Sequence, residues 1–470
     1  MNHLISTVVR KLPLLAVTSV WLAASAPSAS AAKPDPGARA GEFTKACHKG
    51  RRHLHRSAHC KKHRHNRFHG EKFLYVVATD GHGDNPDFLA LIGTNPAIPG
   101  HYGRIFKRVD VPYLDDELHH FGYSLDQKRL IIPGLFSNRV YIFDVSRNPR
   151  NPRLVAINED LVDQSGYIVP HTVIGMPENE VLITMIGALS ESTGPGGIVR
   201  LDDRTGEFLD YYGPGPHRNP VTSVPGYMYD FGFNEHVNRA VSTTFGWPAD
   251  VGAGINPAGF GNEVAVWDFA SQEVIQTVDL GENCGALEVR WIEHLNIGMT
   301  NCPGTNSLWV WEDEDRDGFY DFHQVLSADD GLAGPVDMVL TENHDLYITN
   351  YFGDSLQKFD ISDPYNPALV DQVSLPHPNM IRVSPDGHRV YVSNQLVTTW
   401  DNDENFGGPR NDRYGIWLYH VQDDGTLAAE SRKGRPWVDF TNVRMKNSRG
   451  PAGPHQMFFD PSVELEFGHH

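Results

Sequence analysis

Helical periodicity is almost absent from this chain of 470 residues. No amphipathic helix interrupts the short apolar runs that begin at about Phe73, which argues against a helical bundle. The 44 glycines and 32 prolines instead place turns between these runs, and this composition favours many short strands. With 40% hydrophobic residues the chain can bury a large core, so we predict an all-β fold.

Long apolar segments are also missing after residue 31, which excludes a later membrane helix. Residues 1–31 carry two positive charges, then an apolar run from Leu12 to about Ala26, then Ala29-Ser-Ala31. This order is typical of a secretory signal peptide with a small-x-small cleavage site. A membrane anchor is the alternative, but the run is short for a bilayer and contains Pro13. We expect a periplasmic or secreted protein with no membrane span after cleavage.

Cysteine is scarce, with four residues that form two local pairs, Cys47/Cys60 and Cys284/Cys302. In an oxidising compartment each pair is a candidate disulfide, although the sequence does not prove the pairing. A catalytic thiol is disfavoured, because an exported free cysteine is open to oxidation.

Residues 32–70 lack apolar periodicity, and we expect them to be a disordered arm. Nine Lys or Arg lie between Lys45 and Arg67, and seven histidines lie between Lys45 and His69. Residues 1–69 hold 13 Lys or Arg and 2 Asp or Glu, which gives this segment a net charge of +11. The whole chain has a net charge of −19, so residues 70–470 carry −30. Two interpretations stay open: a solubilising tail for an acidic body, and a metal-capturing segment that loads a site elsewhere. Nucleic acid is not an expected partner of an exported chain.

Residues 71–470 contain a repeat, which we interpret as one propeller domain. Each unit opens with a polar residue, continues through an apolar strand and a turn, and ends a second strand 13 or 14 residues later. The units start 42 to 59 residues apart, which is the spread of four-stranded blades with variable loops. The opening residues are His120, His171, Asp230, Glu288, Asp337 and Asn379.

A second apolar pattern follows in every unit, such as Arg139-Val-Tyr-Ile-Phe-Asp144 and Glu263-Val-Ala-Val-Trp-Asp268, and it predicts third strands. A seventh unit can be assembled from Asp87-Phe-Leu-Ala-Leu-Ile92 and the C-terminal His455-Gln-Met-Phe-Phe459. We therefore predict a seven-bladed β-propeller that is closed by N- and C-terminal strands.

The innermost strands of a propeller line its central channel, so the unit-opening residues should converge near one mouth. Imidazole nitrogens are good ligands for copper, zinc, iron and nickel, and the circle contains several histidines. We predict that a transition metal binds there and that His377 is a second-tier ligand. The predicted first ligands are His119, His120, His171 and His455.

The carboxylates of the circle are Asp230, Glu288 and Asp337, and we assign them to the second shell of the metal. A metal-bound histidine usually donates its other N–H to a carboxylate or a carbonyl, which is the role expected of these residues. The alternative is that polar residues at the blade starts only cap strands and bind water.

The segment Asp313-Glu-Asp-Arg-Asp-Gly-Phe-Tyr-Asp321 fits the pattern Asp-x-Asp-x-Asp-Gly-x-x-Asp. This spacing folds carboxylates around a hard cation, and Gly318 permits the tight turn. Gln324 stands at position twelve, where an EF-hand has Glu, so this is not an ordinary EF-hand. We expect structural calcium, against the alternative of an acidic solvated hairpin. The candidate ligands are Asp313, Asp315, Asp317 and Asp321.

The segment Asp115-Asp-Glu-Leu-His-His120 is similar to the Asp-Glu-Leu-His-His signature of the selenium-binding proteins and their bacterial branch, the methanethiol oxidases. Gly259-Phe-Gly-Asn-Glu-Val-Ala-Val-Trp-Asp268 resembles their blade four, and Phe359-Asp-Ile-Ser-Asp-Pro364 and Pro385-Asp-Gly-His-Arg-Val-Tyr-Val392 are also similar. The resemblance covers residues 85 to about 460.

The resemblance implies a seven-bladed propeller and, for exported bacterial members, copper-dependent oxidation of methanethiol. Methanethiol, O2 and water would give formaldehyde, hydrogen sulfide and hydrogen peroxide. His119, His120 and His171 would be catalytic, and these three and His455 match histidines that the family retains. Where some members carry a selenium-associated cysteine, this chain has Tyr102-Gly-Arg-Ile105, so selenium binding through that thiol is not implied.

Two classes of function stay open at this point. The first is a copper oxidase that acts on a small thiol with O2 as its second substrate. The second is a non-catalytic exported propeller that binds a metal or selenium and acts as a binding or interaction protein. Fold alone does not separate them, because propellers host both.

Overall fold

The structure is a computed structural model that describes residues 70–81, 83–189, 195–213, 227–246, 259–401, 413–430 and 434–464. The chain divides into two units, Met1–Phe68 and His69–His470, and all described residues belong to the second. The predicted signal peptide (1–31), the basic arm up to residue 69, and the Cys47/Cys60 pair lie outside the described residues.

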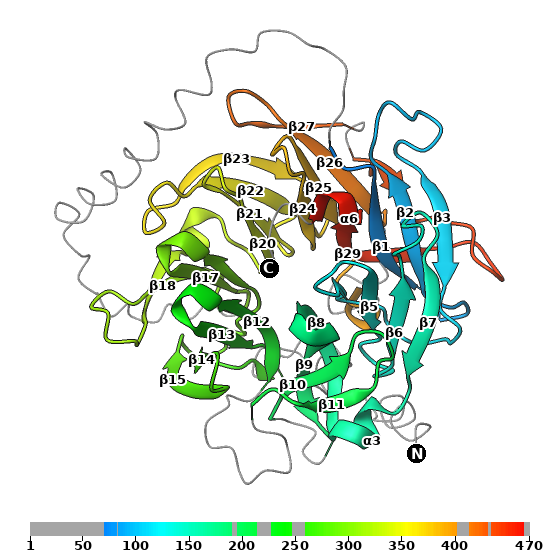
Figure 1. Cartoon of the computed structure of the whole chain (residues 1–470). Coiled ribbons are helices and arrows are strands. Elements are labelled where there is room, and N and C mark those ends of the chain that lie inside the picture. Colours follow the sequence, from blue (N-terminus) through cyan, green and yellow to red (C-terminus); the bar gives the residue numbers. More distant parts are fainter. Residues whose placement is uncertain are drawn as a thin grey trace, which may run out of the picture. The chain divides into compact units, whose positions relative to one another are not determined.

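Seven β-sheets follow one another around a common axis, so the predicted seven-bladed propeller is confirmed (Figure 1). We number the blades in chain order, starting from the blade whose innermost strand is β4. The blade that contains β1, β2 and β3 is therefore blade 7. Blade 1 contains β4 (Gly122–Tyr123), β5 (Arg129–Pro133), β6 (Val140–Asp144) and β7 (Arg153–Asn158). Blade 2 contains β8 (Tyr167–Met176), β9 (Glu180–Ala188), β10 (Gly197–Asp202) and β11 (Phe208–Tyr211). Blade 3 contains β12 (Met228–Asn234), β13 (Arg239–Thr244), β14 (Glu263–Asp268) and β15 (Glu273–Asp279).

The next three blades repeat this antiparallel order. Blade 4 contains β16 (Val289–Ile292), β17 (Ile297–Cys302), β18 (Ser307–Glu312) and β19 (Asp321–Leu326). Blade 5 contains β20 (Pro335–Leu340), β21 (Asp345–Asn350), β22 (Ser355–Asp360) and β23 (Ala368–Ser374). Blade 6 contains β24 (Ile381–Val383), β25 (Arg389–Ser393), β26 (Gly415–Val421) and β27 (Leu427–Ala429), and β28 (Val438–Asp439) also pairs with β26.

Blade 7 joins the two ends of the propeller. Its order is β29 (Ala452–Phe459), β1 (Phe73–Asp80), β2 (Phe88–Gly93) and β3 (Ile105–Asp110). The C-terminal β29 pairs antiparallel with β1, which places Leu74 opposite Phe459. Closure by N- and C-terminal strands is therefore confirmed, and the structure adds β1 between the two segments from which the seventh unit was assembled.

Helices are few and short among the described residues. They are α3 (Leu161–Ser165), α5 (Thr398–Asp401), α6 (Pro461–Glu464) and the 3-10 turns η1 (Pro177–Asn179), η2 (Glu235–Val237), η4 (Glu293–Leu295) and η5 (Ala328–Asp330). In this part of the chain, none has the length and apolar character that crossing a bilayer requires.

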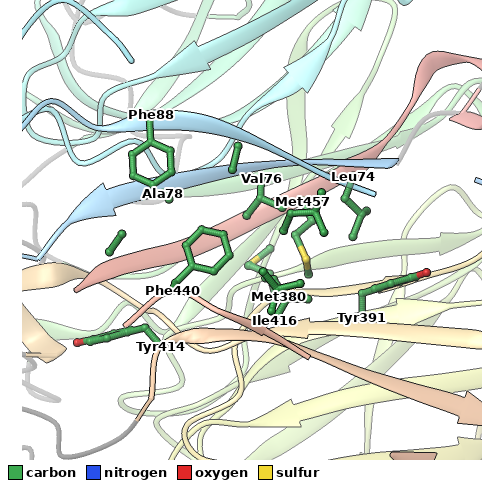
Figure 2. Packing of buried hydrophobic residues seen from close by; sticks show 14 of the residues in the cluster. Leu74, Val76, Ala78, Phe88, Met380, Tyr391, Tyr414, Ile416, Phe440 and Met457 are labelled. Carbon is green, nitrogen blue, oxygen red and sulfur yellow. The ribbon is translucent and has the colours of Figure 1, made fainter. Parts of the chain in front are cut away.

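The hydrophobic core lies between neighbouring blades. Figure 2 shows the cluster between blades 7 and 6, where Leu74 and Val76 of β1 and Met457 of β29 share one apolar layer with Ile416 of β26. All eight residues of β1 are buried, because this strand has blade surfaces on both faces. Burying apolar side chains from segments about 380 residues apart ties the ends of the propeller together.

A disulfide joins Cys284 and Cys302, whose Cα atoms are 4.8 Å apart. Cys302 ends β17, and Cys284 precedes the innermost strand of the same blade. This pairing confirms one of the two candidate disulfides, and it cross-links the start of blade 4.

Candidate metal centre

The residues that open the seven units all stand at or just before the innermost strands, and they are all buried. None of them is more than 4% exposed. They belong to the successive inner strands around the axis, and they divide the circle into a histidine half and a carboxylate half. Blades 7, 1 and 2 supply His455, His120 and His171, while blades 3, 4 and 5 supply Asp230, Glu288 and Asp337.

Four imidazole rings gather in the histidine half. The ring centroids are 3.6 Å apart for His119 and His455, 3.8 Å for His120 and His171, and 5.0 Å for His119 and His120. One nitrogen from each of His119, His120 and His455 lies within 4.8 Å of the others, a spacing that allows one ion to contact all three. His171, the fourth predicted ligand, is outside this group of three, although its ring lies against that of His120.

Within the described part of the chain, each ring keeps one buried nitrogen without a hydrogen-bond partner. These atoms are His119 Nδ1, His120 Nε2, His171 Nε2 and His455 Nε2. Buried polar atoms are nearly always paired in folded proteins, because an unpaired one costs roughly 1–3 kcal/mol. Four such nitrogens in one cluster fit a bound transition metal, for which imidazole is a suitable ligand.

Burial keeps these imidazoles neutral. Desolvation is the main cause that lowers the pKa of His119, His120 and His171 well below the ordinary value of 6.5, and neighbouring histidines lower it further. For His455 burial lowers the pKa to about 3, although a hydrogen bond to the Gln395 carbonyl opposes the shift. A neutral imidazole is the form that binds a metal, so the cluster is ready to act as a ligand set at neutral pH.

Two of the histidines have partners that set their orientation. His455 Nδ1 lies 2.8 Å from the backbone oxygen of Gln395 and 3.2 Å from Asn379 Nδ2. His171 Nδ1 lies 3.3 Å from Thr172 Oγ1. A hydrogen bond on Nδ1 leaves Nε2 to face the cluster, which is how partners of metal-binding histidines fix the ring.

The segment that carries His119 and His120 is held by buried polar contacts. Asp87 accepts the backbone N–H of Leu118 at 2.9 Å, and Asp116 accepts hydrogen bonds from Arg139 and Tyr141. Glu117 accepts the N–H of Thr398 at 2.9 Å and the amide of Gln395 at 3.0 Å. These contacts position two adjacent histidines on one side of the axis.

The carboxylate half is organised around Arg290, which the sequence prediction did not include. Its guanidinium lies 3.3 Å from Asp230, 2.6 Å from Glu288 and 3.1 Å from Asp337. Asp230 and Asp337 also accept backbone N–H groups, from Val289 and Ile381.

The carboxylates therefore do not hold the second-shell contacts predicted for them. In the described part of the chain no hydrogen bond joins these three residues to a histidine. The partners of the histidines are instead the Gln395 carbonyl and the Asn379 amide, beside His455, and the Thr172 hydroxyl, beside His171. Glu288 lies just before β16 and Arg290 lies within it. In extended chain two side chains that are two residues apart point to the same face, and this spacing is the signal that could have revealed the pair.

His377 stands apart from the four histidines. Its ring contacts Tyr351, with centroids 5.1 Å apart, and its backbone N–H donates to Asp354 at 2.8 Å. It is not a member of the group whose nitrogens could share an ion. The structure therefore does not place His377, the second-tier candidate, where it could share an ion with the other histidines.

The aspartate loop between β18 and β19 brings three of its four predicted ligands together. Oxygens of Asp313, Asp315 and Asp317 lie within 4.8 Å of one another, and Gly318 has a φ of 92°. Asp321 instead opens β19 opposite Glu312 and is outside this group. Calcium in this loop stays a prediction.

We expect calcium to raise the stability of the protein by about 1–3 kcal/mol at saturating concentration, because a ligand that binds only the folded state stabilises it. Asp315→Ala with Asp317→Ala should abolish this gain. The measurement is the melting temperature in calcium and in chelator. Asp163→Ala with Asp423→Ala removes two exposed carboxylates elsewhere and should keep the gain. Equal melting temperatures of the wild type in both buffers would contradict the prediction.

Comparisons with known proteins agree with this architecture. A family model described as "56kDa selenium binding protein (SBP56)" matches residues 63–377. A protein named methanethiol oxidase from Danio rerio is 30% identical over 386 residues, which cover 70% of this chain and 81% of the relative. One of the same name from Hyphomicrobium sp is 29% identical over 422 residues, covering 85% and 89%. The solved structure of a hypothetical selenium-binding protein from Sulfolobus tokodaii gives a TM-score of 0.71 at 27% identity, over 84% of this chain and 94% of that protein.

Proposed function

The chain belongs to the 56kDa selenium-binding protein family, and from this premise we propose that it is a methanethiol oxidase that uses copper. Relatives that carry the name methanethiol oxidase, bacterial and vertebrate, support the oxidoreductase assignment. The observation that carries the proposal is the cluster of four buried histidines with one unpaired nitrogen each among the described residues.

The proposed reaction converts methanethiol, O2 and water to formaldehyde, hydrogen sulfide and hydrogen peroxide. Carbon is oxidised from the level of a thiol to that of an aldehyde, and O2 accepts the two electrons and becomes peroxide. Copper would be held by His119, His120, His171 and His455, and when bound it would supply a site for the thiolate and a path for electrons.

The residues of the chain contribute position and exclusion of water. The Gln395 carbonyl and Asn379 hold the ring of His455 in place. Burial of all four rings keeps bulk water away from the reacting atoms, which strengthens electrostatic interactions inside the site.

We place this activity in the periplasm or outside the cell. The signal-peptide pattern of residues 1–31 supports export. The Cys284–Cys302 disulfide supports an oxidising compartment, because such bonds are rare in reducing cytosol.

The test is metal analysis of the purified protein combined with oxygen uptake on methanethiol. We expect copper bound to the protein, and consumption of one O2 for each formaldehyde and each hydrogen peroxide formed. Bound copper without oxygen uptake would favour the alternative, a non-catalytic metal-binding propeller. Absence of both copper and uptake in protein supplied with copper would refute the proposal.

A further inference from the structure

An apolar cluster spans six of the seven blades at the end of the propeller where the histidines lie. Its members include Val169, Tyr229, Phe245, Leu287, Val336 and Trp400, and we call this set the apolar cap. Every member is buried, with at most 8% of its surface exposed. Residues from six blades can form one cluster only where the blades meet around the axis.

The cap forms the layer next to the polar circle. Tyr229, Leu287 and Val336 each come one residue before a carboxylate of the circle, and Val169 comes two residues before His171. The ring of Tyr229 lies 3.8 Å from that of His171 and 6.1 Å from that of His120. The cap is therefore in direct contact with the histidine cluster.

Two aromatic residues of the cap meet across the axis. Phe245 follows β13 of blade 3 and Trp400 lies in α5 of blade 6, and two blades separate them on one side and three on the other. Their ring centroids are 6.0 Å apart, and Phe245 lies 5.2 Å from Tyr229. A continuous row of rings thus runs from Trp400 through Phe245 and Tyr229 to His171.

Hydrogen bonds hold both ends of α5, the short helix that carries Trp400. The N–H of Thr398 donates to Glu117, two residues before His119. Asp401 accepts the hydroxyl of Tyr351 at 2.5 Å and the N–H of Leu396 at 3.2 Å. Trp400 is therefore held over the axis by contacts to blade 5 and to the segment that bears the adjacent histidines.

We propose that the apolar cap, and Trp400 above all, determines the specificity of the histidine cluster by admitting only small apolar thiols and excluding water. This inference rests on the proposed function. A methyl group fits against apolar and aromatic surface without leaving a polar group unpaired, whereas a longer alkyl chain must displace a packed ring. One methylene placed against apolar protein surface changes discrimination by roughly 10- to 200-fold, which is enough to select methanethiol over longer homologues.

The test compares kcat/KM for methanethiol and 1-butanethiol in copper-loaded full-length protein. Trp400→Ala should raise the butanethiol-to-methanethiol ratio at least about tenfold. Trp400→Phe keeps a ring on the cap and should stay near the wild-type ratio. Trp309→Ala removes a half-buried tryptophan from β18 of blade 4 and should leave the ratio unchanged. Phe245→Leu, with the same expectation as Trp400→Ala, serves if that variant does not fold.

A second readout separates this inference from the proposed function. In metal-free full-length chain, the four histidines should react slowly with diethyl pyrocarbonate, and Trp400→Ala should speed the labelling severalfold. If the wild type oxidises no thiol, the proposed function fails, and the labelling rates alone support or overturn the cap. If methanethiol is oxidised but the thiol ratio does not change, or if labelling is as slow in Trp400→Ala as in the wild type, the inference is overturned.

Discussion

Replacing His120 or His171 with alanine is expected to remove copper and to lower thiol oxidation at least about a hundredfold, because loss of a ligand exceeds the 10- to 100-fold effect typical of outer-shell changes. These residues supply two of the four histidine nitrogens that have no hydrogen-bond partner among the described residues, and their ring centroids are 3.8 Å apart. The β fold should persist, since the apolar clusters between the blades are untouched. Copper content by elemental analysis, oxygen uptake and circular dichroism check the three parts of the prediction.

The matched control is His388→Ala. His388 is an exposed residue of the turn between β24 and β25, so its removal should change neither copper content nor activity. Full copper occupancy in the double variant His120→Ala/His171→Ala would refute the assignment of these ligands. Copper loss in the His388→Ala control would show instead that surface histidines account for the bound metal.

Replacing Arg290 with alanine is expected to lower the free energy of unfolding by roughly 3–5 kcal/mol, the usual cost of leaving a buried charge without its partner. Arg290 contacts three buried carboxylates, those of Asp230, Glu288 and Asp337. Without the guanidinium these groups would face each other in a site with little water. Urea unfolding at pH 7 measures the loss. Arg290→Lys should recover only part of it, because an ammonium cannot reproduce the fork of contacts.

The control for this prediction is an ion pair of similar chemistry at the surface. Arg200 contacts Glu180 at 2.6 Å, but both side chains are partly exposed. Arg200→Ala should cost no more than about 1 kcal/mol, since exposed pairs are screened by water. If Arg290→Ala and Arg200→Ala lowered the free energy of unfolding equally, burial would not be the reason why the Arg290 cluster stabilises the fold.

The same cluster predicts a pH dependence. Burial is the main cause that raises the pKa of Glu288 to about 8, from an ordinary value of 4.5, while Arg290 opposes the shift and Asp230 and Asp337 add to it. The folded protein therefore holds a proton that the unfolded chain has released between these two pH values. Stability from this group is complete below about 4.5 and is lost as the pH rises towards 8, at up to about 1.4 kcal/mol per unit. Glu288→Gln should remove this slope from urea-unfolding data, and an unchanged slope would refute it.

The repeat in the amino-acid sequence is sufficient to specify the blades and to bring the histidines together. A separation of 13 residues between a polar start and the end of a second strand specifies a hairpin, and repetition of hairpins with third strands specifies a propeller. In that fold the residue that opens each unit must lie near the axis. The spacing alone therefore places His120, His171 and His455 side by side. The short separation of Cys284 and Cys302 likewise makes them a candidate pair, and both residues flank one hairpin.

Which side chains meet within the circle depends on tertiary packing. Arg290 joins carboxylates from three blades, and the Gln395 carbonyl orients His455, a residue 60 positions away. Trp400 and Phe245 touch although they belong to opposite blades. Local spacing fixes where a residue stands on its own strand, but contacts across the axis depend on the twist and register of all seven sheets. That packing decides which half of the circle forms an ion cluster. It also decides that an aromatic layer covers the histidines.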